Sequence, residues 1–251
     1  MISSRNITTS GCEASPQLIE ILDFIVEYTR RLLASGVHTS RVIRNAIRIA
    51  SSQSADINIF VTVRCLIITL RHAETAEVVT RVVSVSPMPV SFALNSELSA
   101  LSWAAFDDNL TLQEIRERYH AIINRPRIPR WQILTLLSLA NGAFCRLFDG
   151  DWIAVACVII ATAIGYGLKL LLTEKRINLF FVVASCSFVS SLTAASAMLI
   201  DCTWQTAIAT SPLFLVPGVP LITCVIDAVE GHVLTAISRL VNAMLIVLCI
   251  A

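Results

Sequence analysis

Helix-breaking residues gather in one apolar stretch near the end of the chain. The stretch after Trp204 contains Ser211-Pro212 and then Val216-Pro217-Gly218-Val219-Pro220. A proline removes a backbone N–H donor and clashes with the preceding helical turn, and a glycine adds backbone freedom. Three prolines and one glycine within nine residues therefore predict an interrupted helix.

An interrupted helix frees backbone groups that could bind a small ligand. In a bilayer, such groups must be buried in protein or face a water-filled cavity. Secondary transporters place broken helices near the membrane midplane, where a half-helix N-terminus can hold a carboxylate. A purely structural kink is the alternative, because proline and glycine are common in membrane helices. We expect Pro217, Gly218 and Pro220 to line a substrate path.

Two charged residues downstream of the proline motif could act together. Arg239 lies several residues inside the last apolar stretch, where an unpaired charge costs about 2.5–3.5 kcal/mol at the centre of a span. Asp227 is one candidate partner, and an anionic substrate is the other. Gly231 and His232 lie between the two charged residues and join the candidate path. A solvated loop is the alternative for Asp227 and His232.

The sequence lacks the short motifs that indicate catalysis or nucleotide binding. It contains no GxSxG, HExxH, P-loop or GxGxxG motif, and no CxxC pair. Most of the eight cysteines fall in apolar stretches, where cysteine behaves as a small hydrophobic residue. We therefore expect no enzyme activity, no metal site and no cofactor. The net charge of +1 offers no broad basic surface to nucleic acid.

The elements that position these residues differ between the two halves of the chain. Apolar residues make up 55% of the sequence and charged residues 15%, against about 25% charged residues in an average soluble protein. Only 11 of the charged side chains follow Arg130. This composition excludes a wholly soluble or disordered chain and predicts a membrane domain over residues 129–251.

Five apolar runs of sufficient length to cross a bilayer follow one another in this domain. They cover approximately residues 131–148, 152–172, 177–200, 204–226 and 233–251. A buried helical core in a soluble protein is disfavoured, because no polar face remains to cover five such helices. Asn141-Gly142 interrupts the first run; helix packing is the safer interpretation, and Asn141 is kept as a candidate on the substrate path.

Basic residues near the ends of the predicted spans set their orientation, because cytoplasmic loops carry an excess of Lys and Arg. Arg146 is alone on one side, and six basic residues share the other side. The six are Arg125, Arg127, Arg130, Lys169, Lys175 and Arg176. The N-terminal sequence lacks the apolar core of a signal peptide. We expect a cytoplasmic N-terminus and a periplasmic C-terminus.

Residues 1–128 predict a cytoplasmic α+β domain. Ser15-Pro16 indicates the start of a helix that ends at Gly36, and Thr111 with Glu114 forms a capping box for a later helix. Between these signals, Val, Ile and Thr cluster in stretches that favour two or three strands. The expected helices cover about 16–35, 40–52, 94–106 and 111–124, and the expected strands lie within 57–70 and 77–85.

Several segments of the second half resemble a known membrane family. These segments are PRW (129–131), FCRLFDGDW (144–152) and LVPGVPLITCVIDAVEGH (215–232), followed by Arg239. They are similar to the threonine/serine exporter family, and most closely to its separate N-terminal-type subunits, the YjjP type. Thr223 stands where the family often has Asn, and Ala236 stands where Gly is common. Thr223 is also a candidate on the substrate path.

This resemblance implies a subunit of a bacterial inner-membrane secondary exporter of small carboxylate metabolites. The family exports chiefly threonine and serine, and related two-subunit systems are linked to dicarboxylates such as succinate. A separate YjjB-like membrane subunit would be the partner, and an oligomer is possible. A membrane-anchored metabolite sensor or regulatory subunit is the alternative, although simple anchoring spans would not need the Pro-Gly-x-Pro motif. A membrane enzyme is disfavoured because no catalytic motif was found.

Overall fold

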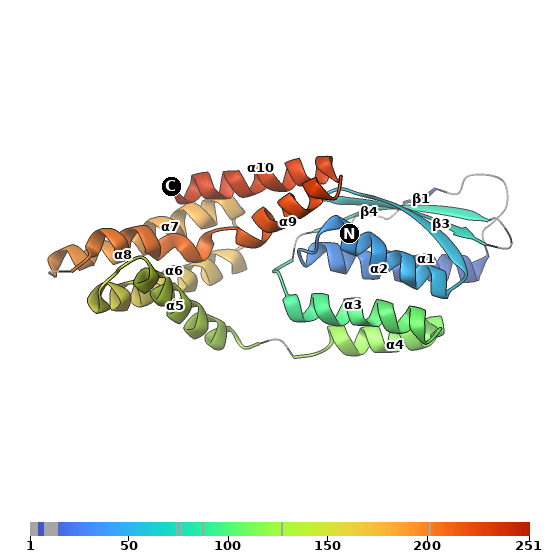
Figure 1. Ribbon diagram of the computed structural model, residues 1–251, viewed down its shortest axis with the longest axis horizontal. Coiled ribbons are helices and arrows are strands. Elements are labelled where there is room, and N and C mark those ends of the chain that lie inside the picture. Colours follow the sequence, from blue (N-terminus) through green and yellow to red (C-terminus); the bar gives the residue numbers. More distant parts are fainter. Residues whose placement is uncertain are drawn as a thin grey trace. The chain divides into compact units, whose positions relative to one another are not determined.

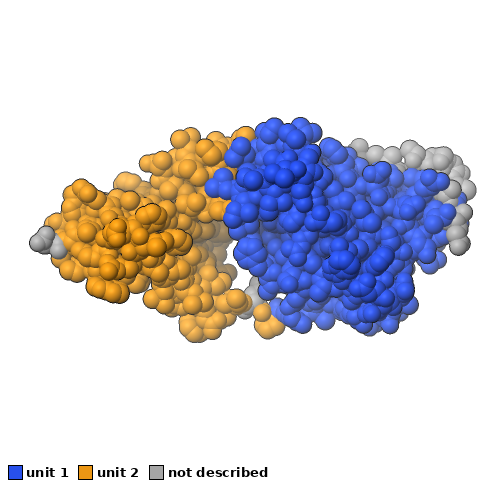
Figure 2. All heavy atoms as spheres, viewed as in Figure 1, with its two compact units in different colours: residues 1–125, 219–240 blue, residues 126–218, 241–251 orange. Residues whose placement is uncertain are grey.

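The computed structural model describes residues 5–7, 15–73, 75, 77–86, 88–126, 128–200 and 202–251. Arg127, which the orientation argument used, lies outside these residues. The chain divides into two compact units (Figure 2). Unit 1 is Met1–Arg125 with Val219–Leu240, and unit 2 is Pro126–Gly218 with Val241–Ala251. A segment from the apolar half of the chain therefore groups with the N-terminal elements.

Unit 1 contains an antiparallel sheet with helices on one face. The strands are β1 (Arg5–Ile7), β2 (Ala55–Val61), β3 (Cys65–His72) and β4 (Val78–Ser84), in the order β1-β4-β3-β2. Helices α1 (Pro16–Ala34) and α2 (Thr39–Ser52) pack against the sheet. Helices α3 (Phe92–Asp107) and α4 (Leu112–Ile123) form a further layer beyond α2 (Figure 1).

Alternating side chains explain why the strands bury one face. In β3, Leu66, Ile68 and Leu70 are fully buried, whereas the residues between them are only partly buried. This period of two points every second side chain towards α1 and α2. The buried side chains join one apolar core that also contains Tyr28. The Tyr28 hydroxyl donates to Leu98 O at 2.7 Å, so its burial leaves no unpaired donor.

Local capping signals place the helix ends of unit 1 where the sequence predicts them. Ser15 Oγ accepts the N–H of Leu18 at 3.4 Å, and Pro16 is the first residue of α1. Thr111 and Glu114 form the expected capping box at the start of α4. Gly36 follows α1 with a φ of +89°, a conformation that side chains with a Cβ rarely adopt. These predicted boundaries are confirmed to within about two residues.

A helical hairpin from the C-terminal half contributes to unit 1. It consists of α9 (Gly218–Val229) and the first part of α10 (Val233–Ile250). Gly231 has a φ of +86°, and His232 N–H donates to Asp227 O at 2.8 Å. This six-residue closing bond with a left-handed glycine ends α9 in the Schellman manner. Gly231 therefore forms the turn of the hairpin.

Unit 2 is built from consecutive helices. They are α5 (Arg130–Leu147), α6 (Trp152–Glu174), α7 (Leu179–Ala195), the 3-10 turn η1 (Ser196–Leu199), α8 (Trp204–Thr210) and the 3-10 segment η2 (Ser211–Leu215). Helix α6 packs against both α5 and α7, and η2 packs against α7. The last residues of α10 also belong to this unit, where Ser187 Oγ donates to Ile250 O at 2.9 Å.

The predicted interruption in the run 204–226 is present in the structure. The α8–η2 segment stops at Leu215, and α9 starts at Gly218. Val216 between them is extended, with a φ of −60° and a ψ of 127°. The ring of a following proline disfavours the helical conformation of the residue before it. Pro217 therefore explains why the helix cannot continue through Val216.

The five-span prediction is confirmed only in part. Three helical segments among the described residues are long and apolar enough to cross a membrane: Trp152–Glu174, Leu179–Leu199 and Val233–Ile250. The bent pair Trp204–Leu215 and Gly218–Val229 would make a fourth span. Helix α5, which covers the predicted first span, is not among them. Its role as a fifth span stays a prediction.

Helices α5 and α6 pack so closely at Gly142 that a larger residue there should lower stability. A Cβ on Gly142 would lie 2.7 Å from Ile159 Cγ1, too short for a carbon contact. We expect Gly142→Ala to destabilise unit 2 by about 1–3 kcal/mol, because overpacking forces a helix shift. Gly167→Ala on α6 is the control, since nothing lies within 4 Å of its Cβ position. Thermal unfolding in detergent should show a lower midpoint for Gly142→Ala alone; equal midpoints would contradict this packing.

Candidate functional site

The N-terminus of α2 has no cap of its own. His38, at the cap position, makes no capping side-chain hydrogen bond, and the first turn contains no acidic residue. The first N–H groups of a helix need acceptors from elsewhere. Asp227 from the hairpin supplies one of them: its Oδ1 accepts a hydrogen bond from the Thr39 N–H at 2.7 Å. Its Oδ2 accepts a second from the Thr39 hydroxyl at 3.1 Å. A buried carboxylate from α9 thus caps α2 at the positive end of its dipole.

Arg239 on α10 completes this contact. Its Nε lies 3.3 Å from Asp227 Oδ2, and its Nη2 donates to Val37 O at 2.9 Å. Asp227 is fully buried and Arg239 is 9% exposed. Such an ion pair is tolerated away from water only when each charge has its partner and further hydrogen bonds. Of the two partners predicted for Arg239, the structure therefore shows Asp227.

Three further contacts surround the ion pair. His232 Nε2 lies 3.0 Å from Ser40 Oγ, and Thr235 Oγ1 donates to Val61 O at 3.1 Å. Glu230 lies 3.6 Å from Arg44. We call the contacts of Asp227, Glu230, His232, Thr235 and Arg239 with the N-terminal elements the hairpin clasp.

Glu230 of the hairpin clasp and His38, which faces it, both have shifted pKa values. Burial lowers the pKa of His38 below its usual range, although the charge of Glu230 opposes this shift. A hydrogen bond from Ser40 is the main cause that lowers the pKa of Glu230. These directions favour a neutral His38 facing an ionised Glu230, whose carboxylate lies 3.9 Å from His38 Nε2.

The Pro217-Gly218-Val219-Pro220 motif shapes the backbone and has no polar side chain of its own that could bind a ligand. Gly218 is the first residue of α9 and has open space around its Cβ position. Pro220 falls in the first turn of that helix, where a missing N–H breaks no intrahelical bond. The Thr223 hydroxyl donates back to Pro220 O at 3.2 Å within the same helix. The motif therefore acts through backbone conformation in this structure.

Asn141 belongs to a separate buried polar cluster in unit 2. Its Nδ2 donates to Thr162 Oγ1 at 2.6 Å and to Ser211 O at 3.1 Å. Ser190 Oγ donates to the same Ser211 carbonyl at 3.1 Å. These bonds connect α5, α6 and α7 to the start of η2. Asn141 is only 3% exposed, so water does not compete for them.

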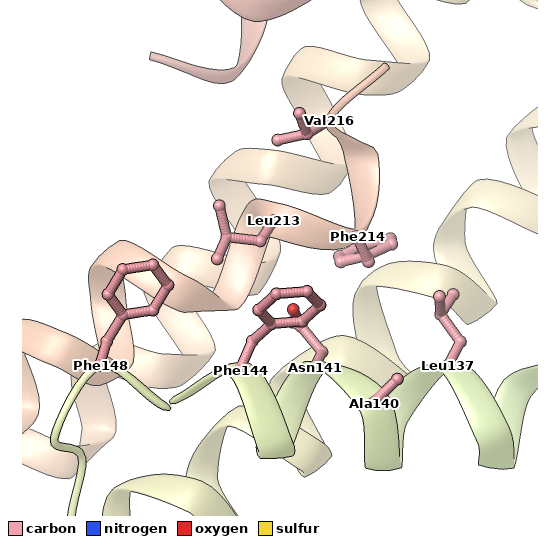
Figure 3. A pocket seen from close by; sticks show the side chains of 8 residues that line it. All are labelled: Leu137, Ala140, Asn141, Phe144, Phe148, Leu213, Phe214 and Val216. Carbon is pink, nitrogen blue, oxygen red and sulfur yellow. The ribbon is translucent and has the colours of Figure 1, made fainter. Parts of the chain in front are cut away.

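A pocket of about 410 Å³ opens beside this cluster, between α5 and the segment before the helix break (Figure 3). Apart from Asn141, apolar side chains line it: Leu137, Ala140, Phe144, Phe148, Leu213, Phe214 and Val216. No charged side chain lines the pocket. It can therefore hold an apolar or uncharged group, but it offers no counter-ion to a carboxylate.

The predicted site residues thus fall into two groups, one in the hairpin of unit 1 and one in unit 2. Asp227, His232 and Arg239 meet in the hairpin clasp, and Gly231 forms the turn of the same hairpin. Asn141 belongs to unit 2. Within the described part of the chain, no group of three or more His, Cys, Asp or Glu could hold a metal ion.

Sequence reasoning missed the residues that bind the predicted ones. They are Val37, Thr39, Ser40 and Thr162. Ser211 was named only as part of the helix break, and its carbonyl accepts from Asn141. One signal was present: the helix beginning at Thr39 has neither a capping side chain nor an acidic first turn, so its N–H groups needed a distant acceptor.

The family of the chain follows from a comparison with known proteins. The ThrE family model, described as "Putative threonine/serine exporter", matches residues 23–251. No solved structure matches the chain significantly.

Three curated proteins are similar to the chain. "Probable threonine/serine exporter" of Mycobacterium tuberculosis is 26% identical over 97% of this chain and 46% of that protein. "Probable succinate transporter subunit YjjP" of Klebsiella aerogenes is 29% identical over 55% of each chain. Its namesake from Escherichia coli is 29% identical over 53% of each. The matched part is about half the length of each relative.

Proposed function

Because the chain belongs to the threonine/serine exporter family, we propose that it is a subunit of a secondary exporter of small carboxylate metabolites. Its apolar helices support a multi-pass membrane protein with a transport role. The substrate is an amino acid such as threonine or serine, or a dicarboxylate such as succinate, since the relatives carry both names. An ion or proton gradient supplies the energy, because the sequence contains no nucleotide-binding motif.

The proposed topology has five spans in a bacterial inner membrane, with the N-terminus in the cytoplasm and the C-terminus in the periplasm. The excess of basic residues at one end of the predicted spans supports this orientation. Helix α5 is the first span in this proposal; it begins with Arg130 and Trp131, which suit a membrane interface.

The proposed partner is a second, YjjB-like membrane subunit. Two relatives are named as transporter subunits. Nearly all of this chain matches less than half of the mycobacterial exporter, so that relative contains further sequence outside the match. A second subunit would supply an equivalent module as a separate chain.

The hairpin clasp is the single observation that best supports carboxylate transport. Arg239 already holds one carboxylate, that of Asp227, in a buried and hydrogen-bonded setting. A substrate carboxylate could replace Asp227 on Arg239, because both present the same planar pair of oxygens. The replacement would release Asp227 from Thr39 and loosen the hairpin from α2. We propose this exchange as the step that couples substrate binding to movement of the broken helix.

An efflux experiment tests the function. Cells loaded with labelled threonine, serine or succinate would be compared with and without this chain, each with and without the second subunit. We expect faster efflux of at least one metabolite only when both chains are present. Unchanged efflux of all three would contradict the exporter assignment, and efflux with this chain alone would contradict the two-subunit proposal.

A further inference from the structure

The orientation of the Asn141 carboxamide is fixed by its neighbours. Ser211 O is a backbone carbonyl and can only accept, so the Asn141 atom 3.1 Å away must be the nitrogen. The second N–H of this nitrogen is directed to Thr162 Oγ1 at 2.6 Å. Both donors are therefore used, and the carboxamide oxygen can only accept a hydrogen bond.

This oxygen is the polar atom offered to the apolar pocket. Figure 3 shows it among the carbon side chains that line the pocket. The part of the chain that the structure describes places no donor on it. Among the described residues, the buried side-chain atoms without a partner are Thr29 Oγ1 and Ser138 Oγ, so the Asn141 oxygen is an acceptor that remains accessible from the pocket. It gains a hydrogen bond when a donor enters. A group that enters the pocket is therefore favoured if it carries a hydrogen-bond donor.

The same geometry disfavours a carboxylate. An ionised carboxylate presents only acceptors, which would face the acceptor oxygen of Asn141. No charged side chain lines the pocket to compensate the lost hydration of the charge. A hydroxyl on a short aliphatic chain fits better, since its carbons contact Phe144 and Phe214 while its O–H reaches the oxygen. The volume of about 410 Å³ is within the range of small-molecule sites.

We propose that Asn141 is a specificity-determining residue, whose carboxamide oxygen accepts a hydrogen bond from a hydroxyl on the exported metabolite. The inference rests on the proposed export function. The pocket receives the uncharged side chain of the substrate and leaves its charged groups outside. It therefore selects hydroxyl-bearing amino acids over dicarboxylates and over amino acids without the hydroxyl.

Threonine and 2-aminobutyrate provide a direct test, because they differ only in the hydroxyl. Proteoliposomes would contain the chain, together with the second subunit if transport requires it, and their counterflow of threonine, 2-aminobutyrate and succinate would be measured. We expect the wild type to prefer threonine over 2-aminobutyrate by about tenfold or more. Asn141→Leu should bring the two rates to within about twofold while 2-aminobutyrate is still carried.

A second variant covers the case in which Asn141→Leu fails to fold. Ala140→Leu fills the pocket without removing an Asn141 hydrogen bond, so it should slow threonine and 2-aminobutyrate equally. Wild-type transport without a threonine preference, or unchanged threonine transport in Ala140→Leu, would overturn the inference. The pocket would then hold a lipid chain or a helix of the second subunit. Absence of transport for all three probes would instead contradict the proposed function.

Discussion

Replacing Pro217 with alanine is expected to reduce export by about tenfold or more while the protein remains in the membrane. Val216 is extended in the structure, and the proline ring after it disfavours the helical alternative. Alanine removes this restriction and restores a backbone N–H, so η2 can continue into α9 as a regular helix. The backbone groups that the break frees would then be paired within the helix, and the substrate path would lose them.

Pro220→Ala is the matched control for this prediction. Pro220 lies in the first turn of α9, where an N–H has no acceptor within the helix. Its replacement should leave the break in place and change export by less than about twofold. Efflux and membrane content would be measured for both variants. Equal loss in the two variants, or normal efflux in Pro217→Ala, would show that the position of the break does not govern transport.

Arg239→Ala is expected to destabilise unit 1 by about 3–5 kcal/mol, because it leaves the buried carboxylate of Asp227 without its counter-ion. The loss should be smaller in the double variant Asp227→Ala with Arg239→Ala, which removes both charges together. Both effects would be measured by chemical unfolding in detergent, with protease cleavage of the α1–α2 turn as the readout.

Arg44→Ala separates the buried pair from ordinary surface charge. Arg44 faces Glu230 at 3.6 Å, and its side chain is 54% exposed. Pairs this exposed contribute less than about 1 kcal/mol, so this variant should unfold almost as the wild type does. A loss in Arg239→Ala no larger than in Arg44→Ala would argue against a buried, energetically coupled pair.

The double variant also separates stability from transport. If Arg239 binds the substrate carboxylate, the double variant should regain stability but not export. Recovery of export together with stability would mean that Arg239 serves only to hold the hairpin. Thr39→Val tests the contact of Asp227 with α2. It removes the hydroxyl that donates to Asp227 Oδ2 and keeps the backbone N–H that donates to Oδ1.

Local features of the fold were predictable from the sequence alone. The capping residues Ser15, Thr111 and Glu114 fix their helix ends through bonds within four residues. Pro217 breaks its helix through a clash with its own neighbour. The hairpin brings Asp227 and Arg239 together over a short loop, and Asp227 was one of the two partners that the sequence offered for Arg239.

Contacts between distant parts of the chain were not predictable. Asp227 caps α2 at Thr39 across 188 residues, and Asn141 binds the carbonyl of Ser211 across 70. The residue types alone do not identify these partners. A carboxylate can accept from any free donor, and a carboxamide can pair with any free donor or acceptor.

The sequence by itself thus determined the helix ends at Ser15 and Thr111 and the break at Pro217, because neighbouring residues fix them. It did not determine the cap of α2, which comes from distant Asp227. The tertiary structure alone decided which distant group each charge and amide meets. Hydrogen bonds require their partners within about 3 Å and in line, and only the packing of the helices brings groups that far apart in sequence to such a distance.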